Sequence, residues 1–438
     1  MILAQPCETV RTTVTAGVSS GRLLLSFGFI VFCVVIMMEP NKLLGLISCL
    51  LVVTAVTAEN LEIVNQWGFL EFELPYDYDL INNYRPENIL FTGLEIARDR
   101  LFLAMPRLRA GVPATIATIP RHTPPGSSPV LQAYPSWDFH GAERGDLNCT
   151  GFISVYRMRQ DKCGRLWVLD SGVMTSIDDF RRVCDPKIVI IDMHTDLPVR
   201  TVVFPREVLR PASLFTNLIV DESQGSCDSA FAYISDTAAP GIVVYDSRQD
   251  RAWRFIHPAM FPDPDFGDYD IQGEKFTLMD GVVGLAHSAN LGQLYFQPLA
   301  TDRLFSVPTG VLKKGPLAEF EELPIALVGH KSSQGVGLTV DPRDDTIYFS
   351  PLTETAIASW QPGTNEQKVI AYDPTRLQFT SELRCAELDG GNIWGLSTRF
   401  QRFFKRQARA EEINLRIIRI PKSPRYHHFG FGYNNTVF

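Results

Sequence analysis

The sequence predicts an all-β fold, specifically a six-bladed β-propeller. The first observation is a short unit, clearest in residues 161–172 (DKCGRLWVLDSG). There a polar turn leads into four apolar residues, and the run stops at polar and small ones. Such a run between turn signals is too short for a helix and is typical of a strand buried on both faces.

The same unit recurs along the chain, and its number predicts the number of blades. Its aromatic residues are Phe102, Trp167, Tyr233, Tyr295, Tyr348 and Trp394. Their spacing runs from 46 residues, between Tyr348 and Trp394, to 66 residues, between Trp167 and Tyr233. That length holds about four strands and a loop, the content of one blade. Because the spacing is irregular, the alternative that such runs recur by chance in an all-β protein stays open.

Composition is the third observation. The chain has 31 Gly and 29 Pro among 438 residues, which suits a turn-rich β protein. It is 45% hydrophobic and 21% charged, ordinary values for a globular protein with a large core. The net charge of −8 argues against a nucleic-acid partner, which usually needs a basic face.

The expected elements follow the repeat in chain order. Residues 61–74 are strand-like, with one apolar face formed by Leu70, Phe72 and Leu74, so we expect an early strand that could complete the last blade. The remaining expected features are a first blade around 90–120, a second over 151–204 and a third over 218–256, a fourth opening at Gly281, a fifth opening at Gly335, a sixth over 385–420 and a flexible tail at 421–438.

The N-terminus reads as a processed leader. Residues 38–58 have the form of a secretory signal peptide, with Lys42, an apolar centre and a Val56-Thr57-Ala58 cleavage site. We expect residues 1–37 to be an upstream extension and 59–420 to form one secreted, extracellular propeller domain. The rival interpretation is a membrane anchor at 23–38, but that run is shorter than the ~20 residues a span needs. We therefore expect no stable membrane insertion.

Motifs for common cofactors are missing from the sequence. There is no nucleophile elbow, zinc motif or phosphate loop, and Gly335-Val-Gly337 opens a strand that no helix follows. The acidic loop at 263–270 lacks the Gly and distal Glu of an EF-hand, so we interpret it as a solvated loop. We expect no cofactor and no metal.

Specific motifs resemble the yellow/major royal jelly protein family over residues 61–420. The carrying residues include Gly111-Val-Pro-Ala114, Ser154-Val-Tyr-Arg157, Arg165-Leu-Trp-Val-Leu-Asp-Ser-Gly172, Tyr233-Ile-Ser-Asp236 and Asp280-Gly281. The resemblance implies a secreted six-bladed propeller. It also implies insect pigmentation, cuticle or secretory biology. Some members are credited with converting dopachrome to dihydroxyindole, and salivary members bind biogenic amines in the channel at the propeller axis.

The resemblance also implies how the cysteines pair. Without the leader, Cys149, Cys163, Cys184, Cys227 and Cys385 remain, an odd number that leaves one thiol over. It implies Cys149–Cys184 and Cys163–Cys227 pairs, with Cys385 free, although other connectivities stay open. Asn148 and Asn434 open glycosylation triplets, and a disulfide at Cys149 would hinder modification of the first.

Candidate catalytic residues lie near the ends of the repeat strands. Isomerising dopachrome needs a base for a ring proton and a polar group to steady the carbonyls. Asp170 and Asp236, at equivalent places in successive blades, and His287 are our candidates. His287 departs from the more usual Leu at its place in the family. The alternative for the two aspartates is that they cap tight turns.

Amine binding would make different demands. A cationic amine prefers an aromatic face and a few polar groups in a concave site. We expect Thr339, Asn392 and Trp394 to line the channel. The leading hypothesis is a pigmentation or cuticle protein acting on catechol- or indole-derived metabolites. The alternatives are a non-catalytic amine binder and a structural secreted protein.

Overall fold

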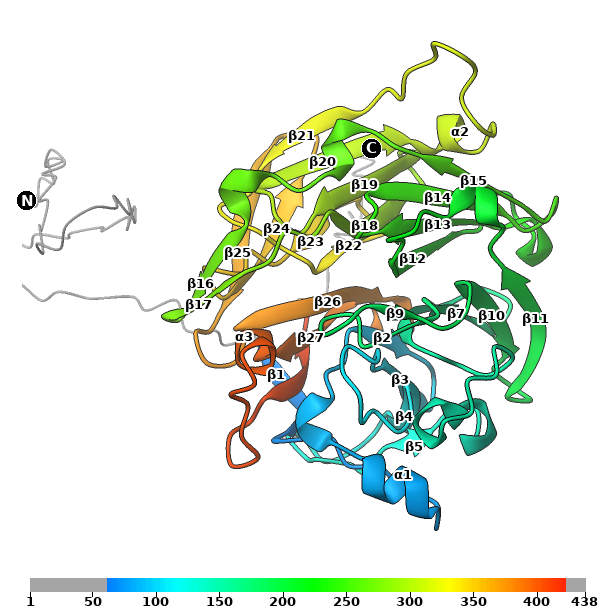
Figure 1. Ribbon diagram of the computed structural model, residues 1–438. Coiled ribbons are helices and arrows are strands. Elements are labelled where there is room, and N and C mark those ends of the chain that lie inside the picture. Colours follow the sequence, from blue (N-terminus) through cyan, green and yellow to red (C-terminus); the bar gives the residue numbers. More distant parts are fainter. Residues whose placement is uncertain (1–60, 423–438) are drawn as a thin grey trace, which may run out of the picture. The chain divides into compact units, whose positions relative to one another are not determined.

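Six four-stranded antiparallel sheets form the structure, a computed structural model that describes residues 61–422. Figure 1 shows the sheets arranged around a central axis. The predicted six-bladed β-propeller is therefore confirmed. The predicted extension, the signal peptide and Asn434 lie outside the described residues.

Each blade runs outward from an innermost strand. The first is β2 (Gly93–Ile96), β3 (Arg100–Ala104), β4 (Ile116–Pro120) and β5 (Gln132–Ala133). The second is β6 (Val155–Gln160), β7 (Arg165–Asp170), β10 (Lys187–Asp192) and β11 (Leu197–Val203). The third is β12 (Phe215–Asp221), β13 (Phe231–Asp236), β14 (Gly241–Asp246) and β15 (Arg251–Phe255).

The last three blades repeat this order. The fourth is β18 (Val282–Ser288), β19 (Gln293–Pro298), β20 (Arg303–Pro308) and β21 (Ala326–His330), with α2 (Thr309–Leu312) between β20 and β21. The fifth is β22 (Leu338–Val340), β23 (Ile347–Phe349), β24 (Ala356–Gln361) and β25 (Glu366–Tyr372). The sixth is β26 (Phe379–Ala386), β27 (Asn392–Thr398), β28 (Leu415–Ile420) and β1 (Glu62–Trp67).

The recurring aromatic residues occupy one structural position. All six lie on the second strand of their blade and are buried, from Phe102 on β3 to Trp394 on β27. Several donate a hydrogen bond to a nearby aspartate, as Trp167 does to Asp161 and Tyr233 does to Asp221. The recurring aromatic residue thus occupies a packing position between blades. It recurs because of this packing, even though the polar residues that follow it differ from blade to blade.

The early strand closes the ring, as the sequence predicts. β1 pairs antiparallel with β28, so the first and last strands of the propeller share one sheet. The indole of Trp67 is buried, packs edge-on against Phe91 and donates to the Pro129 carbonyl. Gly68 follows β1 directly, and a side chain would not fit there because a Cβ would lie 2.2 Å from the Ala410 carbonyl oxygen.

The sixth blade begins earlier than predicted, at Phe379 instead of Cys385. Its innermost strand reads FTSELRCA, and the polar letters hide it from a search for apolar runs. Glu382 and Arg384 on this strand face the axis, where they find charged partners. The innermost strands β2, β6, β12, β18, β22 and β26 contact one another in that cyclic order.

Insertions gather at the face where the innermost strands begin, here called the upper face. One is the hairpin of β8 (Val173–Met174) and β9 (Arg181–Arg182), and a second is the hairpin of β16 (Asp268–Ile271) and β17 (Glu274–Thr277). The others include α1 (Tyr78–Asn83) and α3 (Phe400–Phe404). Phe276 of β17 contacts the rings of Phe400 and Phe404, which ties the second hairpin to α3.

Within residues 61–422, no helix has the length and apolar character that crossing a bilayer requires.

Trp67→Ala tests the closure of the ring. Truncating a fully buried tryptophan costs about 3–5 kcal/mol through lost burial and the cavity left behind. We expect that loss in the free energy of unfolding measured by denaturant titration. The matched control is Trp137→Ala, since Trp137 is only partly buried. Equal losses for the two variants would contradict a special role for the β1–β28 closure.

Candidate functional site

The innermost strands carry a buried charged cluster at the axis. Glu382 accepts from Arg157 through one carboxylate oxygen and from Arg159 through the other, at 3.0 Å. Asn217 of β12 accepts from both arginines, at 3.2 and 3.3 Å. Arg384 pairs with Glu95 of β2 at 2.8 Å. Innermost strands of four blades are therefore joined by charge-assisted hydrogen bonds.

A different group of side chains lies toward the upper face. Tyr156 stands near the start of β6, Tyr269 lies on β16, and Asp280 lies two residues before β18. The Tyr156 hydroxyl is 2.7 Å from Ser176 Oγ, in the loop between β8 and β9. The Tyr269 hydroxyl is buried and has no hydrogen-bond partner among the described residues. We call Tyr156, Ser176, Tyr269 and Asp280 the upper cluster.

Asp280 is the acid of the upper cluster. Its side chain is only partly buried, yet the surrounding protein raises its pKa to about 6, with desolvation as the cause. Within residues 61–422 no hydrogen bond or ion pair holds its carboxylate. Desolvation raises the pKa of Tyr156 and of Tyr269, and the charge of Asp280 raises both further. The carboxylate is therefore within electrostatic reach of both hydroxyls.

Apolar side chains surround the upper cluster. Tyr156 and Tyr269 belong to one core cluster with Val283 and Val336, against which Ile177 and Leu278 pack. An acid in such surroundings keeps its proton up to higher pH, because little water or countercharge stabilises the carboxylate. A recessed, solvent-reachable acid with a perturbed pKa beside two phenols can exchange a proton with a small ligand.

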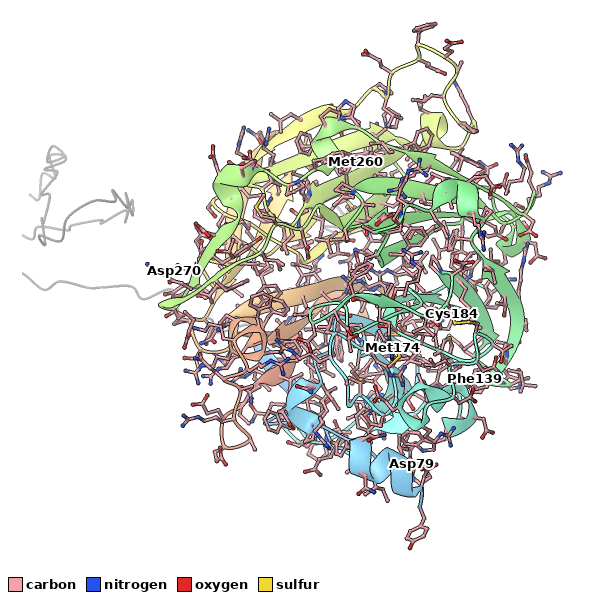
Figure 2. All side chains as sticks on the ribbon, viewed as in Figure 1. Asp79, Phe139, Met174, Cys184, Met260 and Asp270 are labelled. Carbon is pink, nitrogen blue, oxygen red and sulfur yellow. A yellow bond between two sulfur atoms is a disulfide. The ribbon has the colours of Figure 1, made fainter. Side chains whose placement is uncertain are left out.

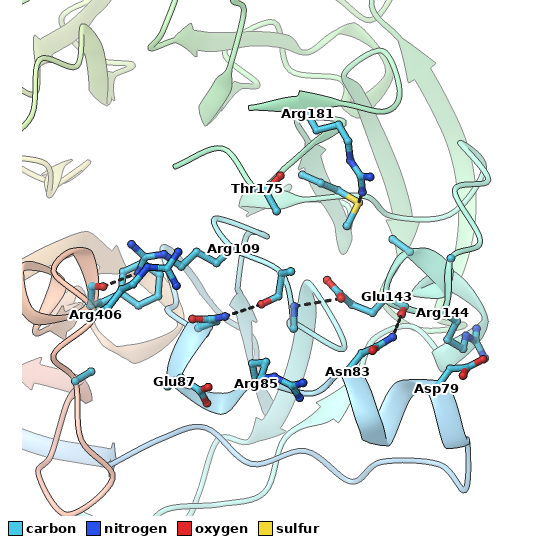
Figure 3. A pocket seen from close by; sticks show the side chains of 18 residues that line it. Asp79, Asn83, Arg85, Glu87, Arg109, Glu143, Arg144, Thr175, Arg181 and Arg406 are labelled. Carbon is cyan, nitrogen blue, oxygen red and sulfur yellow. Dashed lines mark hydrogen bonds between the residues drawn. The ribbon is translucent and has the colours of Figure 1, made fainter. Parts of the chain in front are cut away.

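A cavity of about 770 Å³ opens next to the loop between β8 and β9, and no residue of the upper cluster lines it. Figure 3 shows Arg109 and Arg406 on one side of it, with Glu143 on another. Arg109 is anchored by the carbonyls of Phe403, at 2.6 Å, and Phe404, at 3.0 Å. Thr175, adjacent to Ser176, lines the same cavity. The loop between β8 and β9 thus contributes to both the cavity and the upper cluster.

The predicted catalytic aspartates are both fully buried at the upper ends of their strands. Asp170 accepts from the backbone N–H groups of Ile153, Ser154 and Gly172 and pairs with Lys187 at 3.0 Å. Burial opposes its ionisation, but Lys187 and the three N–H groups outweigh burial and lower the pKa of Asp170.

Asp236 repeats this arrangement one blade later. It accepts from the N–H groups of Leu214 and Ala239 and pairs with Arg254 at 2.9 Å. Its side chain has no solvent-exposed surface. Both aspartates therefore hold turns and strand ends together, and their catalytic role stays a prediction.

The third predicted catalytic residue, His287, lies at the opposite end of the propeller. It is near the end of β18, and its Nε2 is 3.5 Å from Asp221. Desolvation lowers its pKa, Asp221 opposes that change, and nearby Lys313 adds to it. The structure does not bring His287 together with Asp170 and Asp236.

The predicted ligand-binding residues are divided between strands. Thr339 lies on β22, an innermost strand, where its hydroxyl accepts from the Cys385 N–H at 3.3 Å. Asn392 and Trp394 lie on β27, the second strand of its blade, and both donate to Asp389, at 3.1 and 2.8 Å. Only Thr339 among the three is on a strand that surrounds the axis.

Two disulfides occupy the second blade and its neighbour. Cys149 is bonded to Cys184 and Cys163 to Cys227, the pairing the family resemblance implies. Cys385 is a free, partly buried thiol. Figure 2 shows Cys184 close to the β8–β9 region. Asn148 is exposed, and its side-chain oxygen accepts from the Thr150 N–H at 3.0 Å.

No group of three or more His, Cys, Asp or Glu residues in the range 61–422 is arranged to hold a metal ion.

Sequence reasoning missed Asp280, Tyr156 and Tyr269 as site residues. A signal for the first two was present, because Asp280-Gly281 and Ser154-Val-Tyr-Arg157 are among the motifs that carry the family resemblance. Tyr269 gave no signal, since it lies in an acidic insertion that reads as a solvated loop. Their proximity depends on the closed ring.

The fold and the charged cluster at the axis define a class, the six-bladed β-propellers with a polar centre. The sequence profile described as Major royal jelly protein matches residues 153–424, more than half of the chain, and the chain belongs to this yellow/major royal jelly protein family. Dopaminechrome tautomerase of Drosophila melanogaster is 29% identical over 384 residues, covering 82% of this chain and 81% of the relative. Protein yellow of Drosophila erecta is 30% identical over 371 residues, covering 81% and 68%.

Lys187→Met tests the structural account of Asp170. Removing the cation leaves a buried carboxylate without its countercharge, which costs about 3–5 kcal/mol of the free energy of unfolding. The double variant Asp170→Asn/Lys187→Met should lose less than the sum of the single losses. Because the folded-state pKa is lowered, the contribution of Asp170 is present above the unfolded pKa of about 3.9 and is lost as pH falls through the folded pKa.

The control for this cycle is Lys275→Met. Lys275 is 79% exposed and lies 3.8 Å from Asp270, so its loss should change stability by less than about 0.5 kcal/mol. A Lys187→Met protein that unfolds at the wild-type denaturant concentration would contradict the account.

Proposed function

We propose that this chain is a secreted yellow-type protein of the pigmentation or cuticle pathway that isomerises catechol-derived aminochromes, with Asp280 as the proton-transfer group. One observation carries the proposal: a partly accessible acid with a pKa of about 6, unpaired among the described residues and within electrostatic reach of two tyrosine hydroxyls. The likeness to a dopaminechrome tautomerase supports the substrate class.

The reaction needs no redox partner. Conversion of an aminochrome to a dihydroxyindole moves two protons from ring carbons to two carbonyl oxygens and leaves the composition unchanged. A carboxylate with a pKa near the working pH can accept a proton from carbon and release it again. The hydroxyls of Tyr156 and Tyr269 are suited to donate hydrogen bonds to the oxygens as they gain negative charge.

A second candidate function rests on the same acid. A carboxylate without a protein cation, within electrostatic reach of Tyr156 and Tyr269, also suits a protonated biogenic amine. In that case the protein binds amines and does not accelerate any reaction. The two disulfides support secretion in either case, because disulfides persist in oxidising compartments.

Asp280→Asn is the decisive substitution. We expect the rate of dopaminechrome loss above the spontaneous rate to fall about 10²–10⁴-fold, because the amide cannot accept the ring proton. In the wild type the rate should rise with pH through about 6 and then level, since the carboxylate is the active form. Wild type that does not accelerate the reaction but releases saturable heat with dopamine would favour the amine binder.

The same substitution should stabilise the protein at neutral pH. The folded pKa of Asp280 is raised, so folding favours the protonated acid, and stability falls as pH rises from about 4 through about 6. Replacing the acid by a neutral amide should therefore raise the free energy of unfolding at pH 7 by about 1–3 kcal/mol. A residue with a purely structural role would lose stability instead.

The matched control is Asp270→Asn. Asp270 lies on the β16–β17 hairpin of the same insertion, at its outer end (Figure 2), and 52% of its side chain is exposed. This variant should keep wild-type activity and stability. An Asp280→Asn protein with full activity would overturn the proposal.

A further inference from the structure

The charged cluster at the axis contains more cations than anions. Three guanidinium groups, of Arg157, Arg159 and Arg384, meet two carboxylates, of Glu95 and Glu382. The cluster therefore has one positive charge in excess. Buried ions are costly unless a countercharge accompanies them, so an unmatched guanidinium at this depth needs an explanation.

The acceptors of the cluster are already occupied. The two oxygens of Glu382 receive Arg157 and Arg159, and those of Glu95 receive Arg384 together with the N–H groups of Ile96 and Gln160. The side-chain oxygen of Asn217 accepts from both arginines of β6 and from the Leu218 N–H. Every side-chain oxygen of the cluster thus already receives at least one donor.

Two donors of the cluster have no acceptor. The Nε–H groups of Arg159 and Arg384 are buried and lack a hydrogen-bond partner. Arg159 is 4% exposed, while the side chain of Arg384 is 20% exposed near the lower end of β26, which leaves a route to solvent. The two unfilled donors thus belong to the cluster that carries the excess charge.

The two arginines differ in how firmly they hold their protons. Desolvation lowers the pKa of Arg159 to about 10. Attraction by Glu382 opposes this change, while repulsion from Arg384 and Arg157 lowers the pKa further. Burial opposes the charged form of Arg384 as well, but Glu95 and Glu382 outweigh it and raise the pKa of Arg384.

We propose that the propeller axis binds a small monovalent anion, such as chloride, at the guanidinium groups of Arg159 and Arg384. The anion supplies the missing charge and accepts the two unfilled Nε–H donors. It thereby completes the ion network that joins the innermost strands of the first, second, third and sixth blades. This site lies away from the upper cluster and does not depend on the proposed function.

A crystal of the full secreted chain soaked in sodium bromide tests the site directly. Bromide replaces chloride and scatters anomalously, so we expect an anomalous peak within hydrogen-bonding distance of both Nε atoms. Ordered water at that place, with no anomalous signal, would overturn the proposal.

Thermal unfolding tests the same site in solution. Chloride replaces gluconate at constant ionic strength, so that screening does not change. We expect the midpoint to rise by about 2–4 °C, saturably, between zero and 0.3 M chloride. Arg384→Met leaves two positive and two negative charges in the cluster. In this variant the unfolding midpoint should no longer depend on the chloride concentration.

Two further variants keep the solution test decisive. Arg248 is exposed and has no ion pair among the described residues, so Arg248→Met should keep the full response to chloride. Arg384→Gln serves if the methionine variant does not fold. A chloride response that persists unchanged in the Arg384 variants would overturn the proposal.

Discussion

Six strands that converge on one axis must satisfy their polar groups where little water reaches, and this constraint shapes the whole molecule. Glu382 meets it by joining β26 to both arginines of β6, while Asn217 extends the link to the third blade. Since these groups come from strands far apart in sequence, the network exists only when the ring is closed. Charge at the centre and apolar packing between blades therefore stabilise the same state.

The fold could be predicted because its signal is local and repeated. In each blade the second strand carries a buried aromatic residue, such as Trp167 or Tyr233, and ends soon after it. This pattern can be recognised without knowing which residues pack against the aromatic ring. The start of the sixth blade could not be found in the same way. β26 carries Glu382 and Arg384 toward the axis, and a strand of that composition resembles a loop until its partners are known.

The candidate site was harder to predict, for a physical reason. In the sequence, a polar residue at a strand end looks the same whether it faces a cavity or stabilises its own turn. Asp170 is of the second kind, because three backbone N–H groups and Lys187 bind its carboxylate. Asp280 differs only in lacking such partners among residues 61–422, which no sequence pattern shows. Its proximity to Tyr156 likewise follows from closure of the ring.

The pairing of β1 with β28 has a consequence for how the chain is made. The strand at 62–67 leaves the ribosome early, but its partner at 415–420 is synthesised last. At about 5–20 residues per second, the first strand waits roughly 20–70 s with its hydrogen-bonding edge unpaired. Throughout that interval the open ring exposes strands that could pair with other chains. Pairing of β1 with another chain before β28 is made would therefore lower the yield of folded protein.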